Sequence, residues 1–238
     1  MKNKKLLVLL GIILLLALAV GMFLILKTEQ AKKNNDSAIK FKEEYEKLND
    51  TYAYGDIKHS SLDIIEDNPF VYTSAKKIVD TLKNGTGIIY LGYPKCPWCR
   101  NAVNVLQHLN VDEILYLDMY EQRDAYEVVD GVLNKTKDGT KEYYEMLEIL
   151  DKVLLDYEIE KDNQTYSVGE KRIYVPIVIG VKKGKVVAAH TDVVELDEGQ
   201  SPFELLNDKQ QEELKKIYDE IKEKVYGDIC DFDSGSGC

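Results

Sequence analysis

Residues 87–100, GIIYLGYPKCPWCR, are the feature that most constrains the fold of this chain. The stretch opens with a short apolar run, which is typical of a strand buried on both faces of a sheet. Pro97 suits the first turn of a helix, where a missing N–H leaves no hydrogen bond unmade. We therefore predict a strand, a tight turn and then a helix, with Cys96 and Cys99 at the junction.

A pair of cysteines two residues apart at such a junction is typical of a thiol–disulfide exchange site. The reactive form is the thiolate, and the unpaired N–H groups at a helix N-terminus stabilise negative charge. Lys95 and Arg100 are expected to add positive potential. We therefore expect Cys96 to be an exposed nucleophile with a lowered pKa. Cys99, one turn further along, would be the more buried thiol that resolves a mixed disulfide.

Two other interpretations of this pair are weaker. A zinc site would need Cys230 and Cys238 as further ligands, but seven residues separate these two and the three histidines are scattered. A permanent structural disulfide between Cys96 and Cys99 is also disfavoured, because pairs at a helix start are usually redox-active. No metal or organic cofactor is expected.

The last segment, 227–238, is acidic and rich in glycine and serine, and it contains Cys230 and Cys238. These two could form a structural disulfide across a short flexible loop. They could instead be a second exchanging pair that passes electrons to or from the first, since exposed disulfides are labile. Unpaired thiols or intermolecular links remain a third interpretation.

Residues 6–26 form an unbroken apolar run of 21 residues, long enough to cross a bilayer as a helix. A cleaved signal peptide is the alternative, but the run stays apolar beyond its small-residue pattern at 17–19. We predict an uncleaved single-pass anchor in the cell membrane after a cytoplasmic tail at 1–5. The catalytic domain would then be extracytoplasmic, although lysines on both sides make the charge count weakly discriminating.

The remainder of the chain is acidic, with a formal net charge of −11 and no dense basic cluster. A nucleic-acid partner is therefore excluded, because phosphate binding needs a basic face. Residues 27–68 are polar and are predicted to be a stalk or linker. A helix from 37 would carry only a thin apolar stripe, which favours a solvated stalk over a partner-binding helix. That stripe comprises Ile39, Phe41, Tyr45 and Leu48.

From residue 69 strands and helices alternate regularly. The region 120–172 interrupts this alternation and has poor periodicity. The predicted elements are a strand at 70–72, a helix between Ser74 and Gly85, strands at 88–91 and 114–117, a helix at 141–157, a hairpin turning at Asp162 and Asn163, a strand that begins at Pro176, its partner at 186–190, and a helix between Asn207 and Gly227.

This order, with the Cys-x-x-Cys helix and the proline-initiated strand, resembles the thioredoxin superfamily over 69–226. The motif stretch is most similar to thioredoxin-like proteins known as bacteriocin-transport accessory proteins. The resemblance implies an α/β thioredoxin-like fold, a central mixed sheet flanked by helices, with an insertion at about 120–172. It also implies that Cys96 and Cys99 are catalytic and that the bond before Pro176 is cis.

A cis bond there would leave the backbone of Val175 free to pair with an extended substrate. Trp98, between the cysteines, is expected either to contact substrate or to pack on the insertion. Thioredoxins have a buried aspartate six residues before the first cysteine, where this chain has Tyr90. Asp118, at the end of the next strand, is one candidate proton acceptor for Cys99 and could equally be a solvated carboxylate.

The sequence thus predicts a membrane-anchored thiol–disulfide oxidoreductase. Its substrates would be cysteines of exported or surface proteins, and an unidentified redox partner would restore the site. The alternative is a non-catalytic accessory or binding protein for the export of peptides such as bacteriocins.

Overall fold

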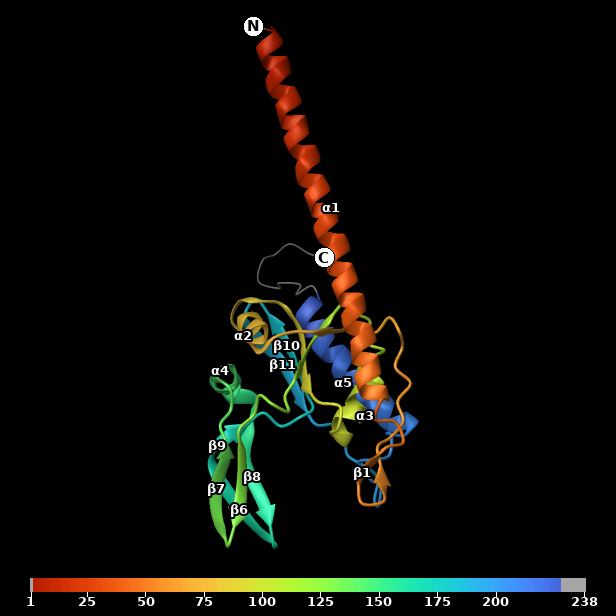
Figure 1. The fold of residues 1–238 in the computed structure, drawn as a ribbon, viewed down its shortest axis with the longest axis vertical. Coiled ribbons are helices and arrows are strands. Elements are labelled where there is room, and N and C mark those ends of the chain that lie inside the picture. Colours follow the sequence, from red (N-terminus) through yellow and green to blue (C-terminus); the bar gives the residue numbers. More distant parts are fainter. Residues whose placement is uncertain (1, 228–238) are drawn as a thin grey trace, which may run out of the picture.

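The computed structural model describes residues 2–227, with side chains from Leu15 onward. A central five-stranded mixed sheet organises the fold, in the order β11-β10-β4-β5-β3 (Figure 1). Strands β3, β4 and β5 are parallel, and β10 and β11 continue the sheet antiparallel. The strands are β3 (Phe70–Tyr72), β4 (Gly87–Gly92), β5 (Ile114–Asp118), β10 (Ile177–Lys182) and β11 (Lys185–Thr191).

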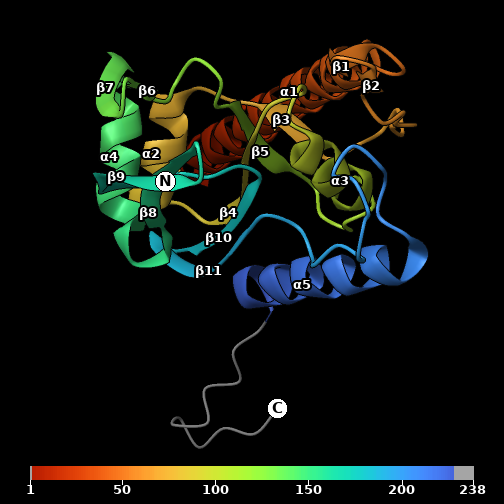
Figure 2. The same cartoon turned by 90° about the horizontal axis from the view of Figure 1, so that it is seen from below.

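Helices cover both faces of this sheet, because its central strands are apolar on both sides (Figure 2). Along β4, Ile88 and Tyr90 pack on one face, while Ile89 and Leu91 pack on the other. The first face is covered by α3 (Pro97–Leu106), α5 (Asp208–Tyr226) and the end of α1 (Lys2–Glu46). The second face is covered by α2 (Ala75–Asn84) and α4 (Lys141–Leu150).

The predicted helix boundaries follow from capping chemistry. The Ser74 side chain accepts a hydrogen bond from the third residue of α2, and Asn207 forms a reciprocal capping box with Gln210 at the start of α5. Both helices begin where the sequence predicts. The apolar stripe of α5 is buried as expected at Leu214, Tyr218, Ile221 and Val225.

Helix α1 extends away from the sheet as one continuous element (Figure 1). Its apolar side chains between Leu15 and Leu26 are largely exposed. Within the part of the chain described with side chains, no helix combines the length and the apolarity needed to span a membrane.

The end of α1 does not belong to a solvated stalk, so the predicted boundary at residue 69 is wrong. Phe41 and Tyr45 are fully buried in the core on one face of the sheet. The segment that follows forms a small hairpin, β1 (Tyr52–Tyr54) and β2 (Ile57–Lys58), and then adds Leu62 and Ile64 to the same core. Two bulky aromatic residues suffice to bury this helix end despite its thin apolar stripe.

The insertion forms two hairpins that project from the sheet (Figure 1). One precedes α4 in the sequence and the other follows it. The hairpin β8–β9 turns at Asp162 and Asn163 as predicted, and both residues have positive φ. Helix α4 is shorter than the predicted 141–157, because a 3₁₀ turn at Asp151–Val153 ends it before β8. The hairpin formed by β6 and β7 was not predicted. The strands of the two hairpins are β6 (Ala125–Val129), β7 (Val132–Lys137), β8 (Leu155–Lys161) and β9 (Gln164–Arg172).

Candidate active site

The two cysteines lie where β4 passes into α3. Cys96 is the N-cap of α3, and its Sγ accepts a hydrogen bond from the backbone N–H of Cys99 at 3.2 Å. Both are free thiols. The expectation of an exposed Cys96 is corrected, since only 5% of the residue is accessible, whereas Cys99 is completely buried. Of the two cysteines, Cys96 is nevertheless the one with any solvent-accessible surface.

The pKa of Cys96 is lowered, as the helix N-terminus predicts. The largest cause is a hydrogen bond from the Cys99 thiol, and the N–H of Cys99 acts in the same direction against burial. The cation that contributes is Arg123, from the loop after β5. Lys95 and Arg100 were expected to lower the pKa of Cys96 because they flank it in the sequence, but neither is among the main causes of the lowered pKa.

Arg100 instead holds the N-terminal segment onto α3. Its guanidinium is buried and donates hydrogen bonds to the carbonyl of Tyr45 at 2.8 Å, the carbonyl of Ser60 at 2.6 Å and Oδ1 of Asn49 at 2.7 Å. These acceptors satisfy a buried cation that would otherwise be costly. The charge of Arg100 is therefore used to fix α1 and its following loop beside the cysteines.

The residues just before β10, Val175 and Pro176, lie next to Cys96. The Val175–Pro176 peptide bond is cis, as the resemblance implies. The Cys96 thiol donates to the carbonyl oxygen of Val175, with a sulfur–oxygen distance of 3.7 Å. Antiparallel pairing of β10 with β4 produces this juxtaposition, since Ile177 lies opposite Leu91. The structure thus brings together Cys96, Cys99, Val175 and Pro176.

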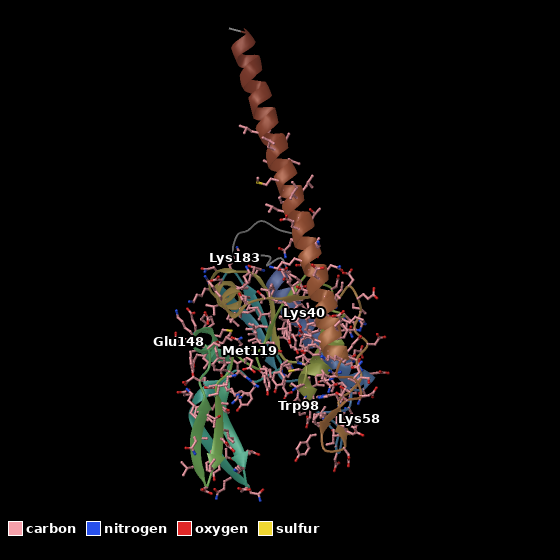
Figure 3. All side chains as sticks on the ribbon, viewed as in Figure 1. Lys40, Lys58, Trp98, Met119, Glu148 and Lys183 are labelled. Carbon is pink, nitrogen blue, oxygen red and sulfur yellow. The ribbon has the colours of Figure 1, made fainter. Side chains whose placement is uncertain are left out.

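Trp98, in the first turn of α3, is half-buried and packs against the core on the face of the sheet covered by α3 and α5, rather than on the insertion (Figure 3). The residue therefore remains partly accessible beside the cysteines. Cys230 and Cys238 lie outside the described residues.

Behind Cys99 the structure places a group of buried tyrosines. The hydroxyl of Tyr90 lies 3.1 Å from that of Tyr45 and donates to the carbonyl of Cys99 at 3.4 Å, while the ring of Tyr116 stacks on that of Tyr90 with 5.4 Å between centroids. Burial raises the pKa of Cys99, and a hydrogen bond from Tyr90 opposes that rise. The pKa of Tyr90 is itself raised by burial, so this hydroxyl acts as a hydrogen-bond donor and not as a base.

Replacing Tyr90 with phenylalanine is expected to slow the step in which Cys99 attacks a mixed disulfide. The Cys99 thiolate would lose a hydrogen bond, so its pKa would rise further and the slowing would be greatest at low pH. Unfolding free energy should fall by about 1–2 kcal/mol, because the Tyr45 hydroxyl loses a buried partner. Rapid-mixing measurements of resolution between pH 6 and 9 would test this, and an unchanged pH profile would contradict it.

Arg123→Gln is expected to raise the pKa of Cys96 and to slow its alkylation at pH 7 about two- to threefold, since one nearby cation is removed. Lys95→Gln is the matched control, because Lys95 is exposed and adjacent in sequence yet is not the contributing cation. The alkylation rate with iodoacetamide as a function of pH measures both variants. A larger effect from Lys95 than from Arg123 would show that the assignment is wrong.

Sequence reasoning missed Tyr45 and Arg123, because both reach the cysteines from segments distant in sequence. The proximity of Tyr90 was signalled only by its position six residues before Cys96. Asp118, expected to be either a proton acceptor for Cys99 or a solvated carboxylate, lines a pocket beside the turn, and its Oδ1 accepts a hydrogen bond from the Tyr120 N–H at 2.8 Å. Comparisons with known protein families, curated proteins and solved structures found no match to this chain.

Proposed function

We propose that this chain is a thiol–disulfide oxidoreductase. The observation that carries the proposal is the environment of Cys96: a thiol of lowered pKa at a helix N-cap, 3.7 Å from the carbonyl oxygen of Val175. An activated thiol beside the backbone of Val175 can attack a disulfide, and an extended polypeptide can pair with that backbone once the Cys96 thiolate no longer donates to its carbonyl.

The proposed reaction conserves electrons and protons. The Cys96 thiolate attacks one sulfur of a substrate disulfide, forms a mixed disulfide and releases the other sulfur as a thiolate. Cys99 then loses its proton and attacks the Cys96 sulfur, which releases the second substrate thiolate and leaves a Cys96–Cys99 disulfide. Two electrons pass to the substrate, and a redox partner returns them. Run in reverse, the same steps oxidise a substrate dithiol.

The strand order supports assignment of the domain to the thioredoxin-like fold. Strands β3, β4 and β5 are parallel and connected through α2 and α3, and β10 and β11 add an antiparallel pair at one edge. In this fold the insertion between β5 and β10 is an elaboration of the usual connection. The proposal rests on topology together with the position of the cysteines.

We also propose that the domain is membrane-anchored and faces exported or surface proteins. The support comes from the apolar run at 6–26 and from the largely exposed apolar side chains of α1 up to Leu26. Exported and surface proteins are the substrates expected for a thiol site outside the cytoplasm, where disulfides persist.

A redox titration of the full-length chain tests the activity. In a Cys230→Ser, Cys238→Ser background, equilibration with glutathione buffers should show reversible two-electron oxidation, with a potential between about −270 and −120 mV. Failure to form the Cys96–Cys99 disulfide in any buffer would refute the proposal. Cellular function retained by Cys96→Ser would favour a binding role.

A further inference from the structure

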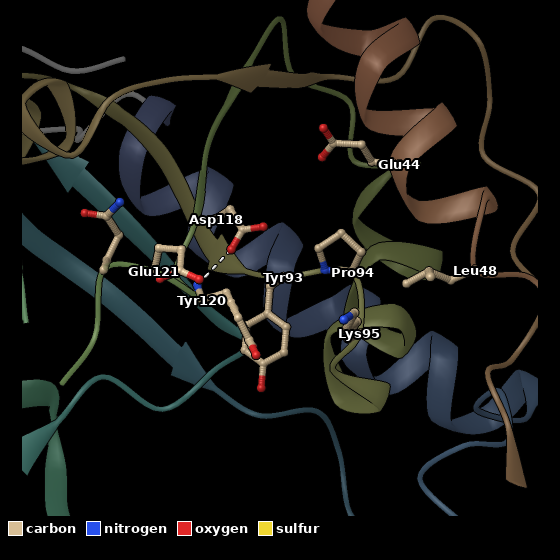
Figure 4. Close-up of a pocket in the computed structure, with 9 residues that line it drawn as sticks. Glu44, Leu48, Tyr93, Pro94, Lys95, Asp118, Tyr120 and Glu121 are labelled. Atoms are coloured by element: carbon tan, nitrogen blue, oxygen red, sulfur yellow. Dashed lines mark hydrogen bonds between the residues drawn. The ribbon is translucent and has the colours of Figure 1, made fainter. Parts of the chain in front are cut away.

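A pocket of about 440 Å³ opens beside the turn that precedes Cys96 (Figure 4). Its position follows from strand pairing: Gly92 and Asp118 are the last paired residues of the parallel strands β4 and β5. The loops that leave these strands therefore run side by side, at the carboxyl ends where open α/β sheets bind ligands. Tyr93, Pro94 and Lys95 come from one loop, and residues 120–122 come from the other.

The wall of the pocket is largely apolar. Leu48, from the end of the N-terminal segment, lies beside Pro94, and Tyr93 packs edge-on against Tyr120 with 5.6 Å between ring centroids. Such a surface suits the methylene stem of a long side chain. Tyr93 also connects the pocket to the thiol, because its carbonyl accepts a hydrogen bond from the N–H of Cys96 at 3.2 Å.

Negative charge predominates among the residues that line the pocket. Three carboxylates line it, from Glu44, Asp118 and Glu121, and Lys95 is the one cation in this lining. Arg123 lies just outside it, over the ring of Tyr93 at 5.2 Å from the centroid. Burial, Glu44 and Glu121 all raise the pKa of Asp118, although Arg123 and the Tyr120 N–H act in the opposite direction. Among the described residues, no lysine or arginine side chain lies within ion-pair distance of Asp118.

The other two carboxylates already have partners. Glu44 accepts a hydrogen bond from Tyr72 and lies 3.6 Å from Lys40, and Glu121 lies 2.7 Å from Lys137. These ion pairs are exposed and therefore weak. Asp118 lines the pocket without an ion-pair partner among the described residues, so it is the carboxylate that a new cation would stabilise most.

We propose that this pocket binds a lysine or arginine side chain of the substrate polypeptide, close in sequence to the reacting cysteine. The inference rests on the proposed function, since it makes the pocket part of the substrate site. The apolar wall contacts the stem of the side chain, and Asp118 pairs with its charged head. Lys95, which precedes Cys96 in the sequence and lines the same pocket, repels the charged head and so favours its approach to the carboxylates (Figure 4). Substrate cysteines with basic neighbours are therefore preferred over those with acidic neighbours.

Disulfide exchange with peptides tests this preference. Each peptide contains one cysteine in a mixed disulfide with a chromogenic thiol and a single lysine, norleucine or glutamate at one of the three positions on either side. With the full-length chain at low ionic strength, lysine should give a rate about five- to tenfold above glutamate at one or more positions. Norleucine should give an intermediate rate, and 0.5 M salt should reduce the preference.

Asp118→Asn should reduce the preference to less than about twofold, since it removes the carboxylate that lacks an ion-pair partner without changing side-chain size. Glu212→Gln, an exposed position on α5 with the same change of charge, should preserve it. Equal rates for lysine and glutamate peptides, or an unchanged preference in Asp118→Asn, would overturn the inference while leaving thiol exchange established.

A binding measurement separates the inference from the proposed function. In this measurement the cysteine of each peptide is replaced by serine, and the protein is the Cys96→Ser, Cys99→Ser variant of the full-length chain. The affinity of each peptide is measured by isothermal titration calorimetry. Tighter binding of the lysine peptide, without exchange by the native chain, would refute the oxidoreductase and retain the pocket. Equal binding of the lysine and glutamate peptides would overturn the pocket.

Discussion

Replacing Cys96 with serine is expected to lower the rate of disulfide exchange by at least about a thousandfold, because a serine hydroxyl is not ionised near neutral pH and cannot replace a thiolate. Of the two cysteines, only Cys96 has solvent-accessible surface, and its pKa is lowered by hydrogen bonds from Cys99. Cys99 is fully buried and its pKa is raised. The rate of substrate reduction by the full-length chain measures the effect.

Cys99→Ser is the matched variant, and its expected result is qualitatively different. The first attack by Cys96 should still occur, but the mixed disulfide should accumulate because nothing resolves it. Mass spectrometry under non-reducing conditions would detect it.

Alkylation of the native chain checks the same assignment without mutation. Iodoacetamide should modify Cys96 before Cys99, and the rate at Cys96 should reach half its maximum below the pKa of an ordinary cysteine, about 8.5. Faster labelling of Cys99 would reverse the roles of nucleophile and resolving thiol.

The strand, turn and helix around the cysteines could be predicted from sequence, because short-range signals determine them. The apolar run of β4, Pro97 in the first turn of α3 and the capping box at Asn207 each act within a few residues. The hairpin at Asp162 and Asn163 belongs to the same class, since its turn residues adopt positive φ themselves.

The electrostatic environment of the site could not be predicted, because it depends on contacts between distant segments. Lys95 and Arg100 flank the motif in sequence, but Lys95 is exposed and Arg100 is directed at backbone carbonyls. Arg123 and Tyr45 supply the relevant contacts from 27 residues after Cys96 and 51 residues before it. Burial of a charge or hydroxyl is a tertiary property that residue type alone does not specify.

The domain boundary at residue 69 failed for a related reason. The polar composition of 27–68 indicates a linker, and a stripe of four apolar residues is too thin to predict burial. In the structure, however, the rings of Phe41 and Phe70 stack with 3.9 Å between centroids, and Tyr116 meets Phe41 edge-on at 4.9 Å. An aromatic cluster concentrates much buried area in few residues, so a helix can dock through two of them.

Phe41→Ala is accordingly expected to lower the free energy of unfolding by about 3–5 kcal/mol, the usual cost of truncating a fully buried aromatic side chain. Ile39→Ala is the matched control on the same helix, because Ile39 is 44% exposed, and it should cost under about 1 kcal/mol. Denaturant unfolding of the full-length chain measures both. Equal, small effects would restore the solvated-stalk interpretation.

Phe41→Ala also tests whether the packing of α1 affects the reactivity of the cysteines. Tyr45, one turn beyond Phe41, accepts a hydrogen bond from Arg100 through its carbonyl, and its hydroxyl pairs with that of Tyr90 behind Cys99. If α1 loosens when Phe41 is truncated, Tyr90 loses its partner, and attack by Cys99 should slow in the same direction as in Tyr90→Phe. Because the side chain of Phe41 has no ionisable or hydrogen-bonding group and its ring stacks on that of Tyr45 with 4.4 Å between centroids, such slowing would be transmitted through Tyr45. Helix α1 would then contribute to the core and would also, through Tyr45, hold Tyr90 in place behind Cys99.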